Sequence, residues 1–233
     1  MATACSSDDV SVSPDSLASL TSSIPFQTGT VIACASGSQN PNEVIAYVYP
    51  RPGVRDLRFF ETNDATVDAL DYSNYQEIDV VPQDFFNGYL NSIVREVSQE
   101  KWLILSFMEG DTLQLSNPIR LKHTSQNTIF TDDITITSAV QTMPEFNWEQ
   151  NVQPSDAIYF QVVSNSSNDL LSGTYTIEPQ FQYYNTQNVV LNITRDLPPP
   201  ALIEGLNYGI TVMGVSEDNW VNFLVSRSFL VDK

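Results

Sequence analysis

Short runs of β-branched and aromatic residues, each followed by turn-forming residues, recur along this chain from residue 30 onward. VIACAS at residues 31–36 is followed by GSQNPN, and the runs KWLILSFME and TLQLSNPIRLK flank the turn EGD. Gly110 stands in that turn, where a positive φ angle is useful, so the two runs indicate a hairpin. Many short strands with regular turns are typical of β-sandwiches. The 233 residues are enough for two such domains, and we predict an all-β protein of two tandem sandwiches.

One segment breaks the strand pattern. In QDFFNGYLNSIVREVSQEK the apolar residues recur in steps of three and four, which places them on one face of a helix. They are Phe85, Phe86, Tyr89, Leu90, Ile93, Val94 and Val97. We therefore predict a helix near residues 83–98, inserted in the first sandwich and packed on it. A helix that binds a partner is the alternative.

Composition divides the chain into three parts. Residues 1–23 are rich in Ser, Thr, Ala and Asp, so they cannot bury enough surface to offset the entropy lost on ordering. We predict a flexible N-terminal tether over 1–23 and an immunoglobulin-like β-sandwich, with the inserted helix, over 24–126. A second β-sandwich is expected over 127–233.

The second sandwich carries a corner motif. In LIEGLNYGITVMG, the residues Leu202, Gly205 and Tyr208 have the spacing of the leucine, glycine and corner tyrosine of fibronectin type III domains. With Trp148 in PEFNW, the chain from about 130 to 233 resembles such a domain. The resemblance implies that Trp148 and the tyrosine ring are buried and that the tyrosine hydroxyl reaches a nearby backbone group. This fold hosts many functions, so the resemblance implies a module rather than a mechanism.

Charge and the rare residue types exclude several functions. Lys and Arg number 10 against 28 Asp and Glu, a formal net charge of −18, and such a chain repels nucleic acid. The single histidine, His123, is expected at the surface rather than as the base of a hydrolase triad. Zinc motifs need clustered Cys and His residues, and the chain has none. No nucleotide-binding, zinc-protease or serine-hydrolase motif occurs. We predict no enzymatic activity and no cofactor, with a glycosidase that uses two carboxylates as the less favoured alternative.

Three aromatic residues are candidates for ligand binding. Tyr183 and Tyr184 are adjacent, so one of them should point outward from the strand or turn that holds them. Trp220 lies in SEDNWVNF, at the expected turn between the last two strands, which the sandwich fold exposes. Exposed aromatic faces stack on sugar rings or on peptides, so these positions indicate a glycan or a protein ligand.

An acidic loop offers weak candidates for a calcium site. Asp64, Asp68 and Asp71 lie in NDATVDALD, and carboxylate oxygens are ligands that calcium prefers. Their spacing does not match an EF-hand loop, and a solvated acidic loop is the alternative.

The N-terminus contains a second resemblance. Thr3, Ala4 and Cys5 resemble the end of a bacterial lipobox, and the SSDD that follows is similar to segments that direct outer-membrane lipoproteins to the cell surface. The resemblance implies lipidation at Cys5, with the membrane reached only through that anchor. The alternative is a cysteine without a role in a disordered tail. The spacing also leaves open a bridge from Cys5 to Cys34, which is itself expected to be buried. We predict a non-enzymatic outer-membrane lipoprotein, an accessory of an outer-membrane complex that binds a surface glycan or docks a protein partner in secretion or adhesion machinery.

Overall fold

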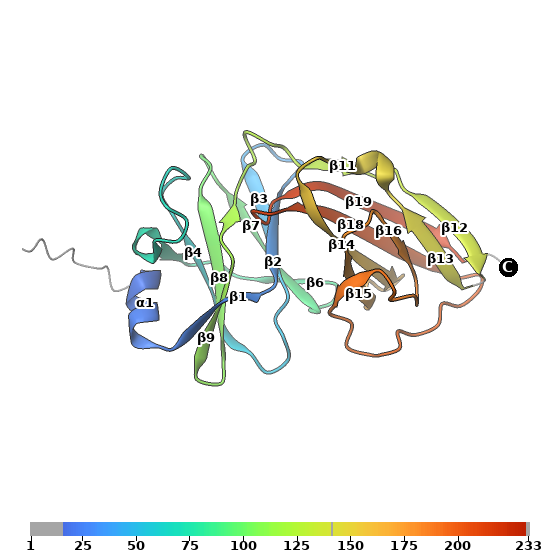
Figure 1. Ribbon diagram of the computed structural model, residues 1–233, viewed down its shortest axis with the longest axis horizontal. Helices are drawn as coiled ribbons and strands as arrows, with labels where there is room; N and C mark the ends of the chain where they lie inside the picture. The colour runs from blue at the N-terminus through green and yellow to red at the C-terminus, as the bar shows by residue number, and fades with distance from the viewer. Residues whose placement is uncertain (1–15, 141, 232–233) are drawn as a thin grey trace, which may run out of the picture.

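The structure is a computed structural model that describes residues 16–140 and 142–231 (Figure 1). These residues form an all-β protein, as predicted, with strands β1–β10 in a first unit and β11–β19 in a second. Three short helices accompany the strands: α1 (Leu17–Ser23), η1 (Tyr72–Asn74) and η2 (Glu149–Asn151). The predicted boundary at residues 126 and 127 falls in the connection between β10 and β11.

Two facing sheets form the first sandwich. One has the order β1-β9-β8-β4-β5, with β10 beside β8, and the other has the order β2-β3-β7-β6. The strands of the first sheet are β1 (Phe26–Val31), β4 (Arg55–Glu61), β5 (Gln76–Ile78), β8 (Trp102–Glu109), β9 (Thr112–Ser116) and β10 (Ile119–Arg120). Those of the second are β2 (Ala33–Gly37), β3 (Glu43–Val48), β6 (Gln83–Phe85) and β7 (Leu90–Glu96). The predicted β8–β9 hairpin is confirmed, with Gly110 at φ +59°.

A six-stranded and a three-stranded sheet form the second sandwich, in the orders β11-β19-β18-β14-β15-β17 and β12-β13-β16. The larger sheet contains β11 (Ile129–Thr131), β14 (Asp156–Asn165), β15 (Leu170–Thr176), β17 (Val189–Asn192), β18 (Asn207–Ser216) and β19 (Val221–Leu230). The smaller contains β12 (Thr135–Val140), β13 (Met143–Asn147) and β16 (Gln180–Gln182).

The corner of the second sandwich has the contact that the tyrosine motif implies. The backbone N–H of Ile203 donates to the hydroxyl of Tyr208 at 2.9 Å. Tyr208, Leu202 and Trp148 are all buried in the core of this sandwich. This contact holds the connection between the two sheets in place.

The two sandwiches lie side by side along the long axis of the molecule (Figure 1) and pack against each other. Tyr47 of β3 and Leu90 of β7 share one buried cluster with Phe160 of β14 and Met213 of β18. The four-stranded sheet of the first unit is therefore covered on both faces, as is the central part of the six-stranded sheet. Strands buried on both faces are nearly continuously apolar, which explains the runs EVIAYV in β3 and AIYFQVV in β14.

The tip of the β18–β19 hairpin enters the first sandwich. The Asn219 carbonyl accepts a hydrogen bond from the Ala35 backbone N–H at 3.1 Å, beside an isolated parallel bridge between Ala35 and Trp220. The Trp220 indole is fully buried among core residues of the first sandwich and donates to the Gln126 carbonyl at 2.9 Å. A loop of one unit thus completes the core of the other.

The predicted helix near residues 83–98 is wrong, because this segment is the β6–β7 hairpin. Phe86, Asn87 and Gly88 form its turn, all three with positive φ angles. Asn-Gly is a strong hairpin signal. The helical spacing arises because the hairpin has two buried faces: Ile93 packs inside the first sandwich, whereas Leu90 packs against the second.

The predicted tether over residues 1–23 is wrong in its last part. Leu17–Ser23 form α1, and the Ser16 hydroxyl caps it by accepting from the Ser19 N–H at 3.2 Å. Leu17 is fully buried with Tyr75 and Leu113, so α1 covers the outer face of the β1-β9-β8-β4-β5 sheet. The helix is ordered because Leu17 and Leu20 lie on one face and meet an apolar surface.

Candidate functional site

The three aromatic candidates lie in different environments. The prediction that Trp220 lies at an exposed loop end is wrong, since it is 0% exposed. The expectation that one residue of the Tyr183–Tyr184 pair points outward is confirmed, because Tyr183 is fully buried and Tyr184 is 41% exposed. Of the three, only Tyr184 presents an aromatic face to a ligand.

Tyr183 has a structural role beside the exposed tyrosine. Its hydroxyl donates to the Pro200 carbonyl at 2.6 Å, which fixes the proline segment 198–200 near the end of β16. Burial raises the pKa of Tyr183 above its usual range. Because the Tyr183 side chain is buried and its hydroxyl already donates to Pro200, its role is to position the proline segment rather than to contact a ligand.

Tyr184 belongs to an uncharged surface groove. The groove has a volume of about 510 Å³ and runs between the Tyr184 turn, strand β17 and the proline segment. Val190 is 54% exposed and Leu197 is 64% exposed, so the groove presents large apolar side chains to solvent. Its lining residues are Tyr184, Thr186, Val189, Val190, Leu191, Asn192, Leu197, Pro198 and Pro199. In a protein of net charge −18, a groove without any charged side chain is a distinct feature.

Strand β17 also ends its sheet. It pairs with β15 on one side, and within residues 16–140 and 142–231 no strand pairs with its other side. Val190 lies where the register with β15 shifts, between Leu191 opposite Tyr175 and Val189 opposite Thr176. An edge strand offers backbone N–H and C=O groups for pairing with another chain. The groove therefore combines an apolar surface with a hydrogen-bonding edge.

Sequence reasoning missed Val190, Leu191 and Leu197. A signal was present in NVVLNIT, because consecutive apolar residues on a strand cannot all face one core. DLPPP, which follows closely, adds one apolar residue and three prolines to the same region of the chain, and these were the second signal of an apolar surface.

The calcium candidates are separate and already hydrogen-bonded within their loop. Asp64 accepts from the Thr66 N–H and hydroxyl, and Asp71 accepts in the same way from Ser73. These hydrogen bonds lower the pKa of both aspartates. Asp68 accepts from the Leu70 N–H. Across the ranges that the structure describes, no three His, Cys, Asp or Glu side chains group to hold a metal ion.

The remaining candidates are a histidine and two cysteines. His123 is 8% exposed, so the expectation of a surface histidine is wrong. Cys34 lies in β2, and burial raises the pKa of its thiol to about 12. Cys5, the lipidation candidate, lies outside the described residues. Among the described residues, none of the helices has the length and hydropathy of a membrane span.

Comparisons with known proteins find likenesses among solved structures. A scan against protein-family models finds no match, and no curated protein sequence matches. Among solved structures, the chain is similar to the FN1–FN3 domains of chicken CNTN1, with a TM-score of 0.32 and 10% sequence identity. The likeness covers 90% of this chain and 69% of that one.

Proposed function

We propose that this protein is a non-enzymatic binding and scaffolding module that holds an extended apolar segment of a partner protein along β17. The observation that carries the proposal is the unpaired edge of β17 beside an uncharged apolar groove. A peptide added as a strand would pair with the β17 backbone and place alternate side chains in the groove. Main-chain pairing gives affinity in this mode, and the groove gives specificity.

A protein partner is favoured over a surface glycan by the burial of the aromatic residues. Trp220 and Tyr183 are inaccessible, which leaves Tyr184 as the one exposed member of the three candidates. The groove around Tyr184 is lined mostly by aliphatic residues and prolines, which suit apolar side chains better than hydroxyl groups.

The net charge of the chain favours a partner of opposite charge. Because the protein has a formal net charge of −18, it attracts a cationic molecule over long range. A segment with apolar residues at its centre and Lys or Arg at its flanks would meet both conditions.

The proposed location is the outer membrane, at the cell surface, with a lipid anchor at Cys5. Thr3-Ala4-Cys5 and the adjacent SSDD support this location. A lipid chain contributes about 0.8 kcal/mol per buried CH₂, so more than one chain on Cys5 would anchor the protein firmly. The protein would then act as an accessory of an outer-membrane complex.

The absence of catalysis is part of the proposal. It is supported by His123, the single histidine, whose ring nitrogens are both buried, since a general base must reach a bound substrate.

Affinity purification from native membranes tests the proposal. The protein is expressed in its own host with a C-terminal tag, as wild type and as the variants Val190→Lys and Ile177→Lys. Ile177 is a matched control because it is 65% exposed in the same sandwich but lies outside the groove. We expect one partner to co-purify with the wild type and Ile177→Lys and to be lost with Val190→Lys, because Lys blocks edge pairing.

Two results would contradict the proposal. A partner retained equally by all three proteins would place docking elsewhere, and a surface polysaccharide in place of a protein would restore the glycan alternative. The intact mass of the purified protein tests the anchor separately, because a Cys5 without lipid excludes it.

A further inference from the structure

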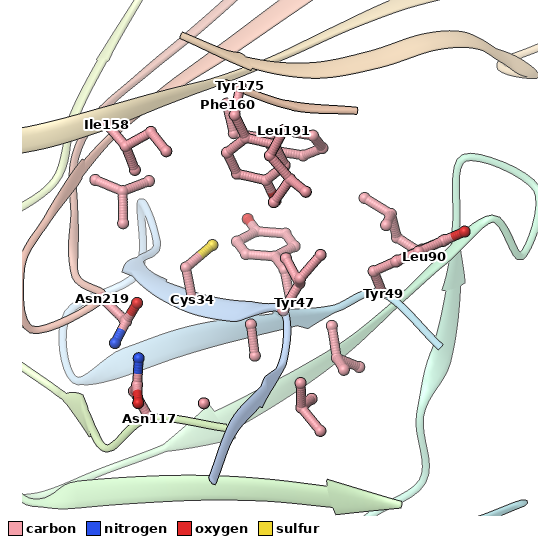
Figure 2. Close-up of a pocket in the computed structure, with 16 residues that line it drawn as sticks. Cys34, Tyr47, Tyr49, Leu90, Asn117, Ile158, Phe160, Tyr175, Leu191 and Asn219 are labelled. Carbon is pink, nitrogen blue, oxygen red and sulfur yellow. The ribbon is translucent and has the colours of Figure 1, made fainter. Parts of the chain in front are cut away.

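A second cavity lies between the two sandwiches, at the face of β3 from which Tyr47 packs against the second unit (Figure 2). It has a volume of about 200 Å³ and is lined by both units. Tyr47 and Cys34 contribute from the first sandwich, and Phe160, Tyr175 and Leu191 from the second. Leu191 is 41% exposed, so the cavity approaches solvent at the β17 end.

Rings dominate the central part of the cavity. The Phe160 and Tyr175 rings are stacked, with centroids 4.5 Å apart and planes 22° apart. Figure 2 shows Tyr47 below them, with its hydroxyl directed toward Phe160, Tyr175 and Leu191 and with the Cys34 sulfur beside it. Flat side chains around an open space suit a flat ligand, because aromatic pairs prefer stacked or edge-to-face contacts.

The lining of the cavity contains polar side chains but no charged ones. None of the sixteen lining residues carries a charge. The only hydrogen bond of the Tyr47 hydroxyl among the described residues is a long one, 3.4 Å, to the Ser36 hydroxyl. Burial raises the pKa of the Cys34 thiol and of Tyr47 to about 12, so both stay neutral and protonated at pH 7. A charged ligand would lose its hydration without gaining an ionic partner.

The size of the cavity limits the ligand further. An engineered apolar cavity of about 150 Å³ holds benzene, so a cavity of about 200 Å³ accepts a ring system a little larger than benzene. We propose that the space between the two sandwiches is a binding site for a small, neutral, mainly apolar ring compound with one hydrogen-bonding group. Tyr47 and Tyr175 would contact that group, and Phe160 and Leu191 the ring.

This site shares one residue with the groove at β17 and is otherwise lined by different residues. Leu191 lines both the cavity and the groove, whereas Tyr47, Cys34 and Tyr175 line only the cavity and Val190 lines only the groove. Variants at these unshared positions test the two proposals separately.

Titration with indole tests the site, followed by two-dimensional NMR and by the melting temperature. Indole is neutral, carries one N–H and is slightly larger than benzene. We expect saturable 1:1 binding with the largest shifts at Tyr47, Phe160 and Tyr175, and a higher melting temperature. Indole-3-carboxylate, similar in shape but charged, is expected not to bind.

Three variants make the assignment specific. Cys34→Leu adds side-chain volume that fills part of the cavity. We expect it to weaken indole binding at least about tenfold, because indole and the larger side chain would compete for the same space. Tyr175→Phe keeps the ring and removes the hydroxyl, so it should weaken indole binding without changing the fold. Tyr159→Phe is the matched control. Tyr159 is next to Phe160 in β14, but it packs in the core of the second sandwich and does not line the cavity.

Three results would overturn the proposal. They are no saturable binding of indole up to its solubility, equal binding of the carboxylate, or binding that Cys34→Leu and Tyr175→Phe leave unchanged. If Cys34→Leu does not fold, as far-ultraviolet circular dichroism would show, Tyr175→Phe and the location of the shifts decide the question.

Discussion

Replacement of Trp220 by alanine tests the unusual contact between the two units. The indole is fully buried in the core of the first sandwich, and loss of a buried aromatic side chain costs about 3–5 kcal/mol. The variant also leaves the Gln126 carbonyl without its donor, which adds about 1 kcal/mol. We therefore expect a loss of about 4–6 kcal/mol in the free energy of unfolding, comparable with the total stability of many domains.

Urea unfolding, followed by circular dichroism and by NMR signals from each unit, measures this loss. Although Trp220 belongs in sequence to the second sandwich, the first sandwich should lose stability most, and the two units should unfold in separate transitions. Tyr184→Ala is the control, with an expected change below about 1 kcal/mol because Tyr184 is partly exposed. A change below about 1 kcal/mol for Trp220→Ala would refute the burial and restore Trp220 as an exposed binding residue.

Three further changes have defined outcomes. In Gly214→Ala the new Cβ would overlap the Phe223 ring, so we expect a loss of about 1–3 kcal/mol in the free energy of unfolding and a lower melting temperature. An unchanged melting temperature would contradict this packing. Tyr208→Phe removes the corner hydrogen bond and should cost about 1 kcal/mol in urea unfolding, and no loss would argue against the contact. Burial alone would raise the pKa of Glu100, but hydrogen bonds, chiefly from Ser125, lower it to about 2. Its contribution to stability is therefore complete above pH 4.5 and lost as the pH falls toward 2, and Glu100→Gln should reduce the dependence of stability on pH in that window; an unchanged dependence would contradict the assignment.

The sequence was a reliable guide where a local pattern has one physical meaning. The corner at Tyr208 is an example, because its spacing, ring burial and hydroxyl contact all arise within a few residues. Gly110 between two β-rich runs likewise predicted its hairpin, since the turn depends on local backbone conformation.

The error in secondary structure at residues 83–98 occurred where a hairpin is buried on two sides. The β6–β7 segment has apolar residues in helical steps because one face packs in its own sandwich and the other on the second unit. Asn87 and Gly88 carried the correct local signal, because Asn-Gly is typical of a hairpin turn. This signal should take precedence over the helical spacing of the apolar residues.

Contacts between the units were beyond a reading of sequence alone. Trp220 lies at a hairpin turn, where a single sandwich would expose it, and it is buried only because the first sandwich receives that turn. The same packing creates the cavity at Tyr47 and Phe160, whose residues are more than a hundred positions apart in the chain. The groove at Val190 was missed because it depends on which strand ends the sheet.

Amide hydrogen exchange at β17 tests the central functional claim most directly. Exchange rates of the Val189–Asn192 amides would be measured with and without the co-purified partner, with the edge strand β11 (Ile129–Thr131) as an internal comparison. The account predicts that the partner slows exchange in β17 and leaves β11 unchanged. Unchanged exchange in β17, together with protection on another surface, would contradict docking at this edge.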